Sequence, residues 1–191
     1  MTALDNMDGR QTVFEAILAR RSVRSFTSRE VDKVTIDTLL EAAVRAPTNL
    51  HEEPWAFAIV QDRTLLDHLS ERARSIEGDA VRREFGEPGA SLFHDAGTLI
   101  LICCQPTVFR SADCWLAAEN LLLAACAIGL GTCIVGSSLG ILNVPESKAM
   151  LGIPETFSVT VPIIIGFPEH QSTPTGRKRP LVLSWTPATR G

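Results

Sequence analysis

The 191-residue sequence contains no tyrosine, and aromatic residues make up only 6% of it. This absence excludes every mechanism that needs a phenol as proton donor or nucleophile, including that of the Tyr-x-x-x-Lys dehydrogenases. Positive charge is also scarce, because 18 Lys and Arg stand against 22 Asp and Glu, for a formal net charge of -4. Nucleic-acid binding usually needs a basic excess, so we expect no nucleic-acid partner.

The sequence also lacks metal-binding and disulfide patterns. Its five cysteines are an odd number, and none lies in a Cys-x-x-Cys pair or near a histidine at zinc-finger spacing. The four histidines are isolated from one another. The segment from Met1 to Arg10 has no apolar signal run. We therefore expect buried thiols, no metal site and a cytoplasmic location.

One long uncharged run, Leu121 to Pro145, could span a bilayer by length alone. It contains four glycines, however, and the charges that flank it, Glu119 and Glu146, are both acidic. We interpret this run as a buried helix, a glycine turn and a buried strand, and expect no membrane partner.

Length and a hydrophobic content of 45% fit one domain over residues 1–191. Periodicity predicts helices over 12–20, 63–77, 112–128 and 145–150, and one that Thr35 caps and that stops before Pro47. It predicts strands over 55–60, 98–104 and 132–135, and one over 158–165 that Pro162 breaks. Residues 78–91 are expected to form a surface loop or lid.

Two segments are expected to need another surface to pack against, one because it is too apolar and one because it has too few apolar residues. The helix from Ala112 to Ile128 is apolar almost all round, which favours packing against a second subunit. The tail from Pro168 to Gly191 has too few apolar positions to fold by itself, so it must lie on another part of the protein.

Two sequence motifs lack the neighbouring residues or elements that their usual functions require. Gly136 to Gly140 fits the G-x-S-x-G elbow of serine hydrolases, but no aspartate follows it and His170 is the only downstream histidine. Gly129 and Gly131 follow a helix and precede a strand, the reverse of a dinucleotide-binding fingerprint.

Two short basic groups remain. Arg20, Arg21, Ser22 and Arg24 offer guanidinium groups and a hydroxyl suited to one phosphate, and Arg177 and Arg179 offer a second set. In an acidic protein such groups suggest convergence on a single phosphate. The alternative is a solvated helix end and a solvated tail.

Five motifs in order along nearly the whole chain resemble those of the FMN-dependent nitroreductases. They are Arg20 to Phe26, Ala46 to Asn49 with Glu53 to Trp55, Gly129 to Cys133, Ile165 to Pro168, and Arg177 to Pro180. The resemblance implies an α+β fold of three layers, α/β/α, with a central mixed sheet. It also implies an intertwined homodimer with one FMN at each of two interfaces.

By position in these motifs, the resemblance assigns the cofactor-binding residues. Arg20, Arg21, Ser22, Arg177 and Arg179 would hold the FMN phosphate, and Arg24 would approach the pyrimidine edge of the flavin. Pro47, Thr48, Asn49 and His51 would come from the other subunit, and Ile134, Val135 and Gly136 would present backbone groups to the ring. No side chain is assigned as catalytic, because the flavin does the chemistry.

The activity implied is ping-pong: NADH or NADPH reduces FMN, and a small nitroaromatic or quinone acceptor is then reduced. Other FMN chemistry, such as dehalogenation, oxidation or flavin modification, and non-enzymatic flavin binding stay open as alternatives. His51 and Glu53 depart from the family pattern, which has Asn and Gln there. Glu53 could lie beside the flavin or cap a backbone amide of its own loop.

Overall fold

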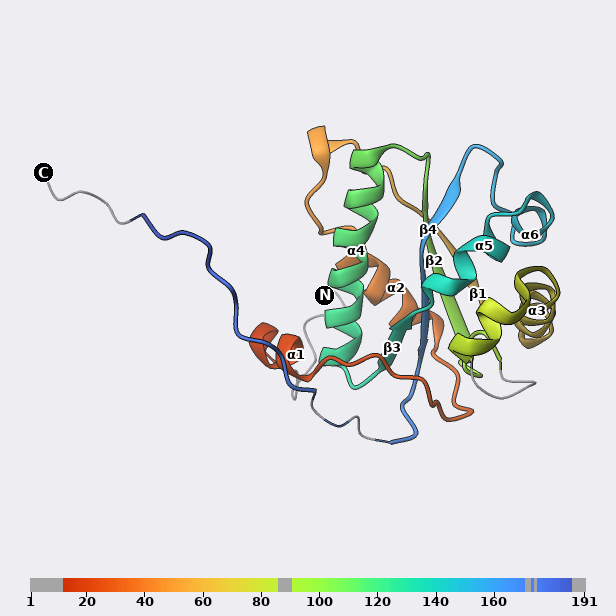
Figure 1. The fold of residues 1–191 in the computed structure, drawn as a ribbon, viewed down its shortest axis with the longest axis horizontal. Helices are drawn as coiled ribbons and strands as arrows, with labels where there is room; N and C mark the ends of the chain where they lie inside the picture. The colour runs from red at the N-terminus through yellow and green to blue at the C-terminus, as the bar shows by residue number, and fades with distance from the viewer. Residues whose placement is uncertain (1–11, 86–90, 171–172, 174, 187–191) are drawn as a thin grey trace, which may run out of the picture.

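The computed structural model describes residues 12–85, 91–170, 173 and 175–186. Its centre is a sheet in the order β1-β2-β4-β3, formed by β1 (Ala56–Val60), β2 (Thr98–Cys104), β3 (Gly131–Ile134) and β4 (Ser158–Gly166) (Figure 1). All neighbouring strands pair antiparallel. Every residue of β2 is buried, which agrees with its apolar sequence and its interior place.

Helices cover both faces of the sheet (Figure 1). α2 (Lys33–Ala43) and α4 (Val108–Ala127) share one apolar core with the sheet. α3 (Arg63–Phe85), α5 (Leu139–Leu142) and α6 (Pro145–Met150) lie over the other core. The predicted three-layer α+β fold is thus confirmed. The parallel component of the expected mixed sheet is a single bridge between Ser22 and Thr132.

The first two helices begin at side-chain caps. α1 (Val13–Ala19) starts at Thr12, which forms a capping box with Glu15. α2 starts at Asp32, whose carboxylate accepts the Thr35 N–H at 2.8 Å. Thr35 is therefore inside the helix, not its cap as the sequence suggested. Asp32 caps better here because its second oxygen also accepts the Thr35 hydroxyl.

Two further sequence predictions are corrected. α3 continues through Gly78 to Phe85, so the predicted loop over 78–91 is helical in its first part, and residues 86–90 lie outside the described residues. Strand β4 runs through Pro162 without a break. Pro162 pairs with Leu101, and its carbonyl accepts the N–H of Val135 at 3.0 Å, so the strand continues although the proline has no N–H to donate and the register with β2 shifts between Ile102 and Cys103.

The segment after α1 is laid against the open edge and end of the sheet. Val23 donates its N–H to the carbonyl of Thr132 at 2.9 Å, and Phe26 bridges Pro168. Two paired glycines make this approach possible: a Cβ on Gly131 would lie 2.8 Å from Val23, and one on Gly166 would lie 2.9 Å from Phe26.

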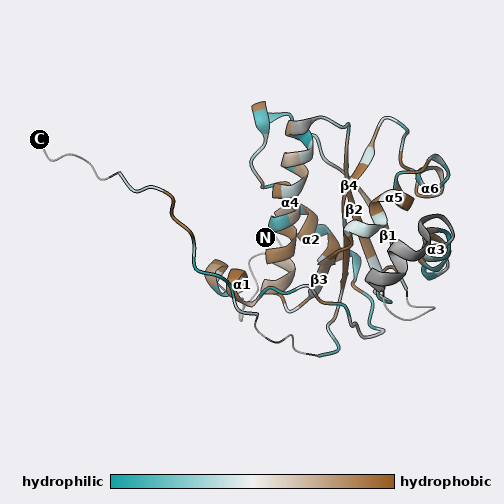
Figure 2. Cartoon of the chain, viewed as in Figure 1, coloured by the Kyte–Doolittle hydropathy of each residue, from teal (hydrophilic) through white to brown (hydrophobic). Residues whose placement is uncertain are grey.

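Helix α4 is not buried on all sides in the single chain, because Trp115 and Leu116 are each 46% exposed. The tail extends away from the body, with an apolar stretch visible as brown in Figure 2. Leu183 is 89% and Trp185 84% exposed. Residues 175–186 of the tail therefore do not pack on the body of their own chain, although the sequence led us to expect that the tail lies on another part of the protein.

Most of the cysteines are buried free thiols, as the sequence predicts. Cys103, Cys104, Cys114 and Cys133 are buried thiols and Cys126 is half-buried. Burial raises the pKa of Cys103 to about 12, so this thiol stays protonated at neutral pH. Among the described residues, no group of three or more His, Cys, Asp and Glu side chains could hold a metal ion. No helix of the described chain is long and apolar enough to cross a membrane.

Candidate functional site

A cavity of about 420 Å³ lies where the N-terminal segment meets the end of the sheet that carries β3. Its walls are made by residues 19–21 and Val23, the turn from Gly129 to Thr132, Cys126, and residues 168–170. Arg20 and Arg21 supply its positive charge. The cavity thus joins three of the five motifs that the sequence singled out.

Arg21 is anchored on one side and unpaired on another. Its Nη1 donates to the carbonyls of Leu18 and Arg20 at 2.6 and 2.7 Å, at the end of α1. Its Nε is buried and has no hydrogen-bond partner. An unpaired buried guanidinium N–H is costly, so it marks a place where an acceptor belongs.

Arg20 is half-buried and only loosely held. Its Nε lies 3.9 Å from Oε1 of Glu119, which is too long for a hydrogen bond. Burial raises the pKa of the Cys126 thiol, and the positive charges of Arg20 and Arg21 oppose that rise. The two guanidinium groups therefore act on the same wall of the cavity.

The extended backbone divides the basic cluster, because alternate residues of an extended chain face opposite ways. Arg20, Ser22 and Arg24 all lower the pKa of Cys133, which burial raises, and Cys133 belongs to the core beneath α3 and α5. Neither Ser22 nor Arg24 lines the cavity. Arg20 thus lines the cavity with Arg21 and also acts on Cys133 with Ser22 and Arg24, whereas Ser22 and Arg24 lie outside the cavity.

His94 does not line the cavity, but it lies close enough to Arg24 for their charges to interact, which sequence reasoning missed. It is half-buried with a left-handed backbone, φ +50°. Burial lowers its pKa, and the positive charge of Arg24 lowers it further, so His94 is predominantly neutral at neutral pH. The sequence treats it as one isolated histidine among four, and nothing in its neighbours signals that it faces Arg24.

The backbone after β3 turns at the residues predicted to face a ring. Val135 is buried, and its N–H is already used by the Pro162 carbonyl. Gly136 is exposed and begins the 3-10 helix η3 (Gly136–Ser138), and a Cβ there would meet nothing within 4 Å. Ser138 of the failed hydrolase motif is buried, with its hydroxyl donated to the Val135 carbonyl at 2.7 Å. It is not a nucleophile.

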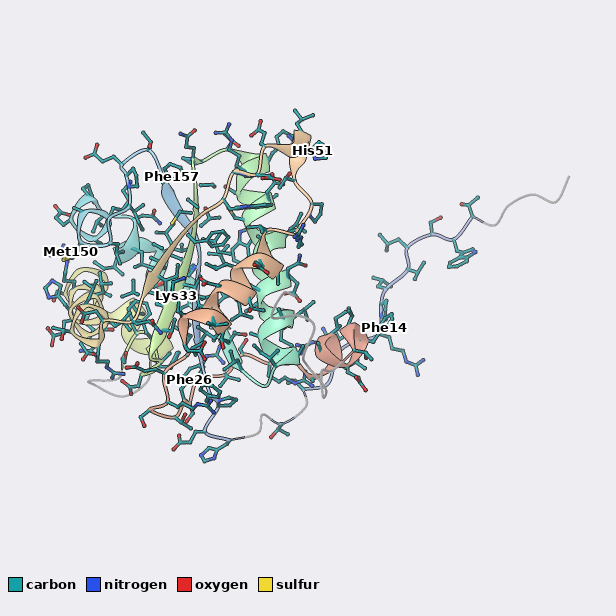
Figure 3. All side chains as sticks on the ribbon, turned by 180° about the vertical axis from the view of Figure 1, so that it is seen from behind. Phe14, Phe26, Lys33, His51, Met150 and Phe157 are labelled. Carbon is teal, nitrogen blue, oxygen red and sulfur yellow. The ribbon has the colours of Figure 1, made fainter. Side chains whose placement is uncertain are left out.

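The loop from Pro47 to Pro54 lies at the opposite end of α4 from the cavity. Asn49, in the 3-10 helix η2 (Asn49–His51), donates its N–H to both carboxylate oxygens of Asp113 at 3.2 and 3.3 Å. Asp113 lies near the start of α4 and Cys126 near its end, about 20 Å apart at 1.5 Å per residue. Figure 3 shows His51 and Phe26 at opposite ends of the molecule. One chain therefore does not bring this loop to Arg20.

The loop is strained and fixed from α4. Leu50, His51 and Glu53 all have left-handed backbones, with φ of 52°, 56° and 45°. Between them, Glu52 accepts a hydrogen bond from Nε of Arg110 at 2.8 Å. His51 and Glu53 are exposed, and among the described residues no backbone amide donates a hydrogen bond to Glu53.

Replacing Asp113 with Ala is expected to lower the free energy of unfolding by about 1–3 kcal/mol, because the carboxylate is only 5% exposed and its loss leaves the Asn49 N–H without its acceptor. Urea denaturation measures this loss. Asp113→Asn keeps one acceptor oxygen and serves as the matched control. Equal stability of the Ala and Asn variants would contradict the assignment.

The second basic group stays apart from the first in the single chain. Arg177 and Arg179 lie in the extended tail and are exposed. No hydrogen bond or ion pair joins either of them to another described residue. Their predicted convergence with Arg20 and Arg21 is therefore not formed within this chain.

Comparison with known proteins follows the same motifs. The family model described as "Nitroreductase family" matches residues 17–167. A protein of Methanothermobacter thermautotrophicus named "Putative NADH dehydrogenase/NAD(P)H nitroreductase" is 31% identical over 170 residues, covering 86% of this chain and 82% of the relative. The "4-nitrobenzoate reductase" of Nocardioides sp. is 26% identical, covering 83% and 81%.

Among solved structures, a nitroreductase from Bacteroides fragilis with bound FMN matches with a TM-score of 0.78 and 28% identity. It covers 94% of this chain and 100% of its own. The sequence match, the fold and the order of the motifs agree over most of the chain. The chain belongs to the nitroreductase family.

Proposed function

We propose that this chain is an FMN-dependent oxidoreductase that uses NADH or NADPH to reduce small nitroaromatic or quinone-type acceptors. The observation that carries the proposal is the cavity that joins Arg20 and Arg21 to the glycine turn at the start of β3. Relatives named NAD(P)H nitroreductase and the FMN-bound neighbour support the choice of cofactor and electron donor.

The residues present fit a phosphate group. Arg20 and Arg21 line the cavity, and among the described residues no carboxylate accepts a hydrogen bond from either, so their N–H groups fit a phosphate. The glycine at position 131 lets the arginine-bearing segment lie directly on the sheet. We assign the FMN phosphate to this cavity, which Ser22 does not line.

The ring would lie over the turn after β3. Gly136 is the residue there whose backbone is exposed and without a Cβ, while Ile134 and Val135 shape the turn. Arg24 adds a positive charge near β3, as its effect on Cys133 shows. A cation at this position would stabilise negative charge that develops on a flavin's pyrimidine edge.

The site is complete only with a second copy of the chain. Pro47, Thr48, Asn49 and His51 cannot reach the cavity of their own chain, so we assign them to the flavin of a partner. Exposed Trp115 and Leu116 on α4, exposed Phe14 and Ile17 on α1, and the apolar tail supply the surface for a homodimer. Ordering of the tail in that dimer would place Arg177 and Arg179 at a phosphate.

When bound, FMN supplies hydride transfer between a nicotinamide and an electron-poor acceptor. The chain's own residues bind, orient and exclude water. The two arginines would hold the phosphate, the β3 turn would supply backbone contacts, and the strained loop of a partner chain would contact the ring. No side chain is required as a proton donor by this assignment. The relative named 4-nitrobenzoate reductase supports a nitroaromatic acceptor.

Steady-state kinetics tests the proposal. Without oxygen, FMN-loaded protein should turn over NADH or NADPH repeatedly only when a nitroaromatic or quinone is present. Initial rates at several fixed acceptor concentrations should give parallel double-reciprocal lines, because the nicotinamide leaves before the acceptor binds. Converging lines would contradict the shared site, and the absence of acceptor-dependent oxidation with both nicotinamides would contradict the function.

A further inference from the structure

A second pocket, of about 400 Å³, lies at the end of the molecule far from the phosphate cavity. Its lining comes from the strained loop, from the start of α4 and from the connection before β4. It is formed by Glu52, Pro54, Gln105, Arg110 and Phe157. Figure 3 shows Phe157 and His51 at this same end. The pocket thus begins immediately after the loop residues assigned to a partner's flavin.

Arg110 supplies the positive charge of this pocket, and only some of its N–H groups donate hydrogen bonds to described residues. Nε donates to Glu52 at 2.8 Å and Nη1 to the side-chain oxygen of Gln105 at 3.0 Å. No described residue accepts a hydrogen bond from Nη2. The two acceptors fix the plane of the guanidinium, so the free Nη2 group is held in place rather than mobile.

The apolar residues that line the pocket suit a flat apolar ligand. Phe157 offers an aromatic ring and Pro54 an aliphatic ring, on the same pocket as the guanidinium. An aromatic carboxylate fits this pocket, because its ring can pack on Phe157 and Pro54 and its carboxylate can pair with the Arg110 guanidinium. Glu52 is itself a carboxylate on Arg110, so it competes with such a ligand for the same guanidinium.

We propose that this pocket is a subsite for an aromatic carboxylate acceptor, in which Arg110 binds the ligand carboxylate and Glu52 is the internal competitor that weakens the binding. The inference rests on the proposed function for its catalytic meaning, since the acceptor would be reduced at a partner's flavin beside the loop. Arg110 and Glu52 then determine specificity without taking part in the electron transfer.

The kinetic test compares 4-nitrobenzoate with nitrobenzene, which carries the same nitro group and no charge. The measured quantity is the ratio of their kcat/KM values in FMN-loaded protein. Arg110→Gln should lower this ratio about tenfold or more, because a charge-assisted hydrogen bond is lost. Glu52→Gln should raise the ratio, and Arg110→Lys should lie between Arg110→Gln and the parent.

Matched controls separate specificity from damage to the loop. Lys33→Gln removes one positive charge from the exposed pair with Asp37 on α2 and should leave the ratio unchanged. Arg110→Gln and Glu52→Gln both break the contact that fixes the loop, so opposite shifts of the ratio in these two variants separate specificity from damage to the loop. A ratio unaffected by Arg110→Gln, or lowered by Glu52→Gln, overturns the proposal.

Calorimetric binding of benzoate to the same FMN-treated proteins gives a readout independent of turnover. Benzoate should bind the parent, bind Glu52→Gln more tightly, and bind Arg110→Gln at least about tenfold more weakly. This result without any nitro reduction would support the subsite and contradict the proposed function. Nitro reduction without Arg110-dependent benzoate binding would leave the proposed function standing and overturn the subsite.

Discussion

Replacing Gly131 with Ala is expected to destabilise the protein by about 1–3 kcal/mol and to weaken FMN binding about tenfold or more. A Cβ at this position would lie 2.8 Å from Cβ and Cγ1 of Val23 and 2.9 Å from Cγ2. Val23 is β-branched and stiff, so it cannot rotate away without moving the backbone that carries Arg20 and Arg21.

Urea denaturation and FMN titration measure the two losses. Gly97→Ala is the matched control, because a Cβ on Gly97 would meet nothing within 4 Å. The double variant Gly131→Ala with Val23→Gly removes all three crowding atoms, so its stability should be close to that of Val23→Gly alone. Full additivity of the two single losses would contradict the crowding explanation.

Replacing Arg20 with Ala is expected to raise the Kd for FMN about 10- to 100-fold. A hydrogen bond to a charged group contributes about 1.5–3 kcal/mol, and each 1.4 kcal/mol is tenfold in affinity. Arg20 is the better choice than Arg21 for this test, because Arg21 also holds the Leu18 carbonyl at the end of α1. The loss at Arg20 is therefore not confounded with loss of that contact.

Flavin fluorescence titration gives the Kd, and thermal unfolding without FMN shows whether the fold is kept. Lys33→Ala removes the same charge from α2 and should leave the Kd unchanged. An unchanged Kd in Arg20→Ala would show that the cavity does not hold the phosphate. An equal loss in both variants would show that only the net charge matters.

Elements with a long, one-sided pattern could be predicted from the sequence. The run from Thr98 to Cys104 is apolar at every position, and it forms the interior strand β2. The apolar helix α4 was expected over 112–128 and begins one turn earlier, at Val108 after the Thr107 cap. A long apolar pattern predicts both the type of element and its burial, so such elements can be predicted from the sequence alone.

Elements decided by competing local signals could not be predicted. Asp32 and Thr35 are both good helix caps, and only the hydrogen bonds between them decide which one acts. Gly78 suggests a helix end, yet α3 continues through it. Pro162 suggests a strand break, yet its neighbours supply enough ladder bonds to carry β4 past it.

The candidate site could be predicted only in part. The arginines at 20, 21 and 24 are close in sequence, but only Arg20 and Arg21 line the cavity, while Arg24 lies close enough to His94 to lower its pKa. Asp113 and Arg110 act on a loop about 60 residues away. No local pattern signals contacts of this range, because the topology alone creates them.

The central claim is that the cavity at Arg20 and Arg21 holds FMN that a nicotinamide can reduce. The visible spectrum of the purified protein, taken after FMN addition and desalting and again after anaerobic addition of NADH or NADPH, tests it most directly. The account predicts that flavin absorbance stays with the protein and bleaches with at least one nicotinamide. Loss of all flavin on desalting, or retained flavin that neither nicotinamide bleaches, would contradict it.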